Sequence, residues 1–190
     1  MRPIRTIIFL LVCIGLLVVA FLLIKNIFTT STVPPASEIK LASYARSGTS
    51  AQYFVDGPIV ANQSHRAMRI SIDAETSKIE LIDGYNNTVI RQDVFPNTVE
   101  SYRAFLAGLE TLGFDNGIKD SKSTEAGKCP LRKRYVYSMT NGSSQVFRYW
   151  STSCGKGTSG AQVASVQTLF RRQIPSAVYN DVYRQCEVDN

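Results

Sequence analysis

Hydrophobic residues follow three patterns along the chain, and each predicts a different kind of structure. Residues 7–24 are all apolar apart from Gly15, and these 18 residues would form a helix of about 27 Å, close to the hydrocarbon thickness of a bilayer. Further on, apolar residues alternate with polar ones, as in half-buried strands. Later they recur every three or four positions, as in helices that pack by one face. The pattern therefore predicts a transmembrane helix followed by a folded domain.

The flanks of the apolar segment predict its orientation. Arg2 and Arg5 precede it and only Lys25 follows closely, so the positive-inside rule places the N-terminus in the cytoplasm and the C-terminal domain outside. The competing interpretation, a cleaved signal peptide, would need a shorter apolar core and a small-residue cleavage site. We therefore expect a cytoplasmic tip and retained anchor at residues 1–25, a stalk rich in Pro, Ser and Thr at 26–50, and an extracytoplasmic domain at 51–190.

The first half of this domain has the period of strands. Residues 68–72 and 78–85 alternate and flank a polar turn, so they predict a hairpin, and residues 88–95 predict a third strand. A short segment at 52–55, with residues 59 and 60, would pair at one edge.

Two later segments have the period of helices. Asn97 stands in an N-cap position with Glu100 three residues on, and an apolar face runs to residue 112. A second apolar stripe, at 163–170, follows a capping-box pattern that begins at Ser159, and Pro175 would start a last short helix. Strands, a helix, a second hairpin and further helices predict an α+β fold, with a small antiparallel sheet and two to three packed helices.

The second hairpin brings two cysteines close together. Residues 134–140 and 143–151 flank Asn141-Gly142, a dipeptide suited to a type I′ turn, in which facing residues would have numbers that sum to 283. Cys129 and Cys154 obey the same sum. Since the domain is expected on an oxidising side of the membrane, a Cys129–Cys154 disulfide is the leading assignment. For Cys186 a bridge to either of them, an intermolecular bridge and a reduced thiol stay open.

Charge and histidine content exclude several kinds of chemistry. The net charge is +6, but residues 1–25 hold three of the 21 basic residues and none of the 15 acidic ones, so the remainder carries only +3. This small excess gives no support for nucleic-acid binding. His65 is the only histidine, so His-rich metal sites are excluded and no metal or cofactor is predicted. A hydrolase that pairs His65 with a distant Ser or Asp is the enzyme alternative, although the chain has no G-x-S-x-G motif.

A basic and aromatic cluster around the second hairpin is the candidate binding site. Its selected members are Arg134, Tyr135, Tyr137, Arg148 and Trp150. Cations interleaved with aromatic rings can hold an anionic polymer or an acidic protein partner. The competing interpretation places the aromatic rings in the core, with the arginine stems covering its rim.

Several short motifs carry a resemblance. They are Gly57-Pro-Ile-Val-Ala-Asn-Gln-Ser-His-Arg66, Asp83-Gly-Tyr85, Cys129-Pro130 and Tyr149-Trp-Ser-Thr-Ser-Cys154. In these the chain resembles short uncharacterised single-span surface proteins of candidate-phyla bacteria of the Saccharibacteria type, over roughly residues 51–175. The resemblance implies a bacterial cell-surface location and a Cys–Cys bridge, and it brings no catalytic residues.

Together these features predict a single-pass membrane protein held in the membrane by residues 7–24. Its extracytoplasmic domain is expected to be a binding or adaptor module for a protein partner or an anionic surface polymer, without catalytic activity. Besides the hydrolase, the alternative is a structural subunit of a membrane assembly that packs through its apolar helix.

Overall fold

The computed structural model describes residues 41–118, 123–155 and 157–188. The predicted anchor at residues 7–24 and the predicted stalk up to residue 40 lie outside the described residues. Within the described ranges, no helix is both long enough and apolar enough to cross a membrane. The short 3₁₀ helix η1 (Leu41–Tyr44), expected in the stalk, contributes the fully buried Leu41 to the core of the domain.

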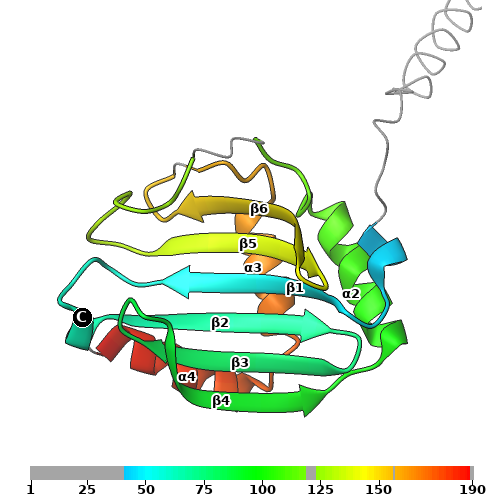
Figure 1. The fold of residues 1–190 in the computed structure, drawn as a ribbon, viewed down its shortest axis with the longest axis horizontal. Helices are drawn as coiled ribbons and strands as arrows, with labels where there is room; N and C mark the ends of the chain where they lie inside the picture. The colour runs from blue at the N-terminus through cyan, green and yellow to red at the C-terminus, as the bar shows by residue number, and fades with distance from the viewer. Residues whose placement is uncertain (1–40, 119–122, 156, 189–190) are drawn as a thin grey trace, which may run out of the picture. The chain divides into compact units, whose positions relative to one another are not determined.

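A six-stranded antiparallel sheet forms the centre of the domain (Figure 1). The strands are β1 (Thr49–Asp56), β2 (Arg66–Asp73), β3 (Thr76–Asp83), β4 (Thr88–Pro96), β5 (Arg134–Asn141) and β6 (Ser144–Thr152). Their order across the sheet is β4-β3-β2-β1-β5-β6. The first four strands form a meander, and the β5–β6 hairpin pairs with the other side of β1. The first strand of the domain therefore lies inside the sheet.

Helices cover one face of this sheet. They are α2 (Val99–Thr111), α3 (Val163–Arg171) and α4 (Ser176–Val188). In Figure 1, α3 and α4 lie behind the strands, and α2 stands at one end of the sheet beside η1. The predicted α+β class, with an antiparallel sheet and packed helices, is confirmed for the described residues.

The core between sheet and helices is rich in aromatic rings. Tyr53 of β1 stacks on Tyr137 of β5, with 5.7 Å between ring centroids, and its ring lies 5.6 Å from that of Phe170 on α3. Phe105 of α2 meets Phe170 edge to face at 5.1 Å. Such pairs add to the large apolar area that aromatic side chains bury, so this cluster joins the β1–β5 pair to two of the helices.

The opposite face of the sheet faces the viewer in Figure 1, with none of the described helices over it. On β2 and β3 this face carries the polar side chains of Arg69, Ser71, Lys78 and Glu80. On β5 and β6 it carries Val136 and Trp150, which are only 6% and 5% exposed. The Arg69 guanidinium lies 5.7 Å from the centre of the Phe54 ring and bonds Glu80 at 3.3 Å. An antiparallel sheet with one packed and one polar face explains the alternating pattern that predicted β2 and β3.

Both predicted helix starts need correction. Thr98 rather than Asn97 caps α2, because the Thr98 hydroxyl accepts the backbone N–H three residues on at 3.2 Å. The Asn97 amide instead donates to the Asp73 carbonyl at 2.6 Å. The capping box expected at Ser159 does not form, since α3 begins only at Val163, without a side-chain cap.

Candidate functional site

The candidate residues gather at one end of the sheet. β1 ends at Asp56 directly opposite Arg134, the first residue of β5, and Arg134 also faces Thr152 at the end of β6. His65 immediately precedes β2. This region, here termed the disulfide end of the sheet, comprises residues 56–66, 83–85, 128–134, 151–154 and 183–187.

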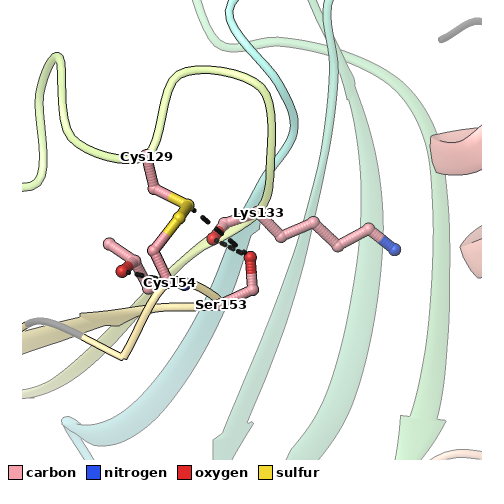
Figure 2. Close-up of a disulfide and its surroundings, with 5 residues drawn as sticks. Cys129, Lys133, Ser153 and Cys154 are labelled. Carbon is pink, nitrogen blue, oxygen red and sulfur yellow. Dashed lines mark hydrogen bonds between the residues drawn. A yellow bond between two sulfur atoms is a disulfide. The ribbon is translucent and has the colours of Figure 1, made fainter.

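A disulfide ties two loops together at this end. Cys129 and Cys154 are bonded, with their Cα atoms 6.0 Å apart (Figure 2). Next to the bridge, the Ser153 backbone N–H and hydroxyl both donate to the Lys133 carbonyl, at 3.0 and 3.2 Å. The predicted cysteine pair is confirmed, and it holds residues 128–133 beside the end of β6.

The register that suggested this pair was nevertheless wrong. The turn lies at residues 142–143, one position later than predicted, and a bulge follows next to Met139 and Thr140. Tyr137 therefore faces Tyr149 rather than Val146. The ladder ends before either cysteine, so the two meet through their loops and not as facing strand residues.

The five predicted binding residues do not form one surface. Tyr135 and Tyr137 belong to the helix-covered face, where Tyr137 is fully buried and Tyr135 half-buried. Strand alternation places Arg134, Arg148 and Trp150 on the other face. Arg134 and Trp150 are only 2% and 5% exposed. Arg148 keeps a third of its side chain exposed and is paired with Glu125.

Arg134 is the cationic part of a buried network. Its Nε and Nη2 atoms donate to Asp56 Oδ2 at 2.9 and 2.6 Å, and Nη2 also donates to the Gly57 carbonyl at 2.6 Å. The other carboxylate oxygen, Asp56 Oδ1, lies 2.9 Å from His65 Nε2. A carboxylate shared by two basic groups fixes the ends of β1, β2 and β5 relative to one another, because buried charges must be paired.

His65 is held on all sides and is 2% exposed. Its Nδ1 lies 3.3 Å from the Pro58 carbonyl, and the Tyr85 ring stacks on the imidazole with centroids 3.9 Å apart. The Tyr85 hydroxyl in turn bonds the backbone of Val60. Both ring nitrogens are thus engaged by Asp56 and a carbonyl, where a hydrolase would need one of them next to a nucleophile.

A shallow pocket of about 400 Å³ lies at the disulfide end. Its lining is Pro58, Leu131, Arg132, Lys133, Ser153 and Glu187. Leu131 is 84% exposed. Arg132 and Lys128 are exposed as well, whereas Lys133 and Arg134 are already paired with Glu187 and Asp56. The exposed cations therefore stand on the loop that the disulfide holds.

The wall of this pocket is fixed by Lys133. Its ammonium donates to the Tyr183 hydroxyl and to a Glu187 oxygen, both at 2.7 Å. Burial lowers the pKa of Lys133, but these two hydrogen bonds outweigh it and raise the pKa overall. The hydrogen bond from Lys133 lowers the pKa of Glu187. Both groups are therefore ionised near neutral pH, and the pair joins loop 128–133 to α4.

Cys186 lies one turn beyond Tyr183, on the buried side of α4. It forms no disulfide with either of the other described cysteines. Burial raises the pKa of its thiol to about 12. A protonated and buried thiol reacts slowly, so Cys186 behaves as a small apolar core residue.

Sequence reasoning missed Asp56 and Tyr85, which complete the network around His65. Asp56 stands at the end of a predicted strand, directly before Gly57-Pro58, where a polar residue usually signals a turn. Its partner Arg134 lies 78 positions away. The cue that could have linked them is the pairing of β1 with β5, which the sequence pattern did not reveal.

Comparisons with known proteins do not identify a function for this fold. No model of a protein family matches the chain, and no curated protein is similar to it. The structure thus defines a broad class, a small α+β domain on an antiparallel sheet. Any function must be inferred from the disulfide end itself.

Proposed function

We propose that the chain is a single-pass membrane protein whose extracytoplasmic domain binds an anionic surface polymer at the disulfide end of the sheet. The observation that carries this proposal is the loop held by Cys129–Cys154. This loop exposes Lys128, Leu131 and Arg132, and the last two line the pocket. Anchor, stalk and orientation rest on the apolar segment 7–24 and its flanking charges.

The disulfide supports the extracytoplasmic location. Structural disulfides persist in oxidising compartments and are rare in the cytosol. Cys129 and Cys154 both follow the apolar segment, on the side that the positive-inside rule places outside. Membrane orientation and disulfide thus favour the same side independently.

Charge explains why an anionic ligand fits this loop. Lys133 and Arg134 are neutralised by Glu187 and Asp56 within the domain. Lys128 and Arg132 remain exposed to solvent, and Leu131 between them offers an apolar contact. Two cations on a pinned loop lose little conformational entropy on binding, which favours contact with regularly spaced phosphates.

The membrane part of the proposal is tested by extraction and topology mapping. Full-length chain in membranes should stay in the pellet after alkaline carbonate treatment, and protease added from the outer side should remove the domain. A variant that lacks residues 7–24 should be found in the supernatant. Release of the full-length chain by carbonate, or protection of the domain from external protease, would contradict the proposal.

The binding part is tested with poly(glycerol phosphate) as the probe and the full chain in nanodiscs of zwitterionic lipid. The K128Q/R132Q double variant should bind about tenfold more weakly, equal to about 1.4 kcal/mol. The slope of log affinity against log salt should fall by about 1.5.

The matched control is R103Q/R172Q, which removes two exposed cations from α2 and the end of α3. It should bind like the unaltered chain. Equal losses in both double variants would show non-specific attraction and overturn the loop as the site. Binding of polyglutamate but not of the phosphate polymer would replace the polymer by an acidic protein partner.

A further inference from the structure

The two edges of the sheet differ in how they are protected. At β6, Ser151 forms a bridge with Gly157, and the N–H groups of Thr158 and Ser159 donate to the Trp150 carbonyl. At the opposite edge, the nine-residue β4 pairs with β3, and its outer side has no backbone partner among the described residues. An open edge of this length is a template for a further strand.

The open edge is also apolar. Val89, Ile90 and Val94 are 41%, 51% and 49% exposed. Natural edge strands are commonly protected by lysine, by inward charges or by proline. β4 contains no lysine, and Pro96 stands only at its last position. Its charges on the helix-covered side, Arg91 and Asp93, are already paired with each other, and Arg91 also with Asp181. These exposed aliphatic side chains are better explained by a strand that becomes covered.

We propose that β4 pairs in antiparallel fashion with β4 of a second copy of this chain, about a twofold axis at Gln92. The sequence of the strand is self-complementary about this residue. Arg91 of each copy would face Asp93 of the other. Opposite charges at facing positions stabilise antiparallel strands. The two sheets would join into one continuous sheet.

The charges also select this register over its neighbours. In a continuous antiparallel sheet facing side chains share a face, so the register can slide only in steps that preserve the alternation. Moving the axis to residue 91 would place Arg91 opposite its own copy. Moving it to residue 93 would place Asp93 opposite its own copy. Like charges directly opposite each other destabilise a strand pair, which leaves Gln92 as the preferred centre.

A bulge limits the length of the pairing. The β3–β4 register shifts between Leu81 and Ile82, so Ile90 is an extra residue on β4. Bulges interrupt the regular backbone pattern on an edge strand. The regular part of the proposed pair is therefore short and centred on residues 91–93, where the charged side chains lie. Within one copy Arg91 already bonds Asp93 and Asp181 on the helix-covered side.

Cysteine cross-linking in the full chain tests the position of the axis. In a Cys13→Ser background, Gln92→Cys would bring the two sulfur-bearing residues face to face, with Cα atoms about 4.5–5.5 Å apart. This separation allows a disulfide. The matched control is Val94→Cys, also exposed on the same strand, whose two copies would lie roughly 13 Å apart.

The expected result is a covalent dimer of the Gln92→Cys chain on a non-reducing gel and none with Val94→Cys. Cross-linking of both variants to the same extent would show random collision and overturn the register. Failure of the Gln92→Cys chain to cross-link under oxidising conditions would overturn the dimer.

A charge exchange gives an independent test, because recovery of pairing in the mixture shows that both variants are folded. When Arg91→Asp pairs with itself, the new Asp at 91 of each copy faces Asp93 of the other. When Asp93→Arg pairs with itself, the new Arg at 93 of each copy faces Arg91 of the other. Neither variant should co-purify with a differently tagged copy of itself. Mixed together, they should co-purify, because every facing pair is then of opposite charge.

Co-purification of each variant with itself, or no co-purification of the mixture, would overturn the proposal. The K128Q/R132Q variant should dimerise like the unaltered chain, because its substitutions lie on the disulfide loop. The proposal of the dimer and the proposal of the anion site can therefore be contradicted independently of each other.

Discussion

At the scale of single residues, Asp56 holds the side chains of Arg134 and His65 in place at the disulfide end. It binds Arg134 through one oxygen and approaches His65 with the other. Arg134 is almost fully buried, so its charge depends on this carboxylate. Removing one partner of a buried ion pair leaves an uncompensated charge, which costs far more than the pair contributes.

We therefore expect Asp56→Asn to lower the free energy of unfolding by about 3–5 kcal/mol. Urea unfolding followed by circular dichroism measures it. The matched control is Asp83→Asn, which removes the carboxylate that Arg66 bonds at a more exposed site, with Asp83 39% exposed. Loss of such an exposed pair should cost no more than about 1 kcal/mol. Similar losses in both variants would contradict the buried network.

The burial of Arg134 also shows which property of a single residue could not be predicted from the sequence. Arg134 lies in a run of four basic residues within seven positions, a pattern typical of an exposed cationic patch. Its burial depends on Asp56, 78 positions earlier, and on the Gly57 carbonyl. A partner at such a distance has no local signal. Two other members of the same run, Lys128 and Arg132, are exposed as the pattern suggests.

At the scale of elements, the disulfide fixes the loop that presents these cations. Replacing both Cys129 and Cys154 by Ser should lower the free energy of unfolding by about 3–4 kcal/mol in the chain-entropy account of a closed loop of this size. Chemical denaturation measures the change. Reduction of the unaltered chain should give the same shift.

The same variant should bind the phosphate polymer more weakly than the oxidised chain, because a released loop must be ordered on binding. Unchanged polymer binding after loss of the bridge would show that a pinned loop is not required. Unchanged stability would mean that the loops hold their positions without it.

Element positions were predictable where the periodicity was strong. The alternation over β2 and β3 and the apolar face of α2 follow directly from one packed face. Strand register was not predictable in the second hairpin. One displaced turn and one bulge, beside Met139, change every pair from there to Arg134, and neither has a distinct sequence signal.

At the scale of the whole molecule, buried tyrosines make the stability of the fold decrease at high pH. Burial raises the pKa of Tyr102 and of Tyr179 to about 12, and raises that of Tyr53 well above its usual value. A pKa that is higher in the folded state stabilises the fold below the unfolded value, near pH 10. This contribution is lost as the pH rises from about 10 towards 12.

We expect the domain to unfold cooperatively in this alkaline range, with tyrosinate absorbance rising together with loss of circular dichroism. Ionisation of Tyr53, Tyr102 and Tyr179 near pH 10 with the fold intact would contradict their burial.

The α+β class of the whole fold followed from the order of the predicted elements, but the strand order did not. The sequence placed 52–55 at an edge, because a short strand followed by Pro58 is typical of one. In the structure β1 is an inner strand between β2 and β5. β1 is an inner strand because β5 pairs with its other side, and no local sequence pattern in β1 predicts that pairing.

The inner position of β1 affects the order in which the strands can pair during synthesis. During synthesis β1 can pair with β2 almost at once, but β5 is made only after a further 78 positions have followed. Until then one side of β1 stays open, and the contact that closes the sheet is a long-range one, which slows folding. The chain should therefore remain loosely folded until its second hairpin emerges.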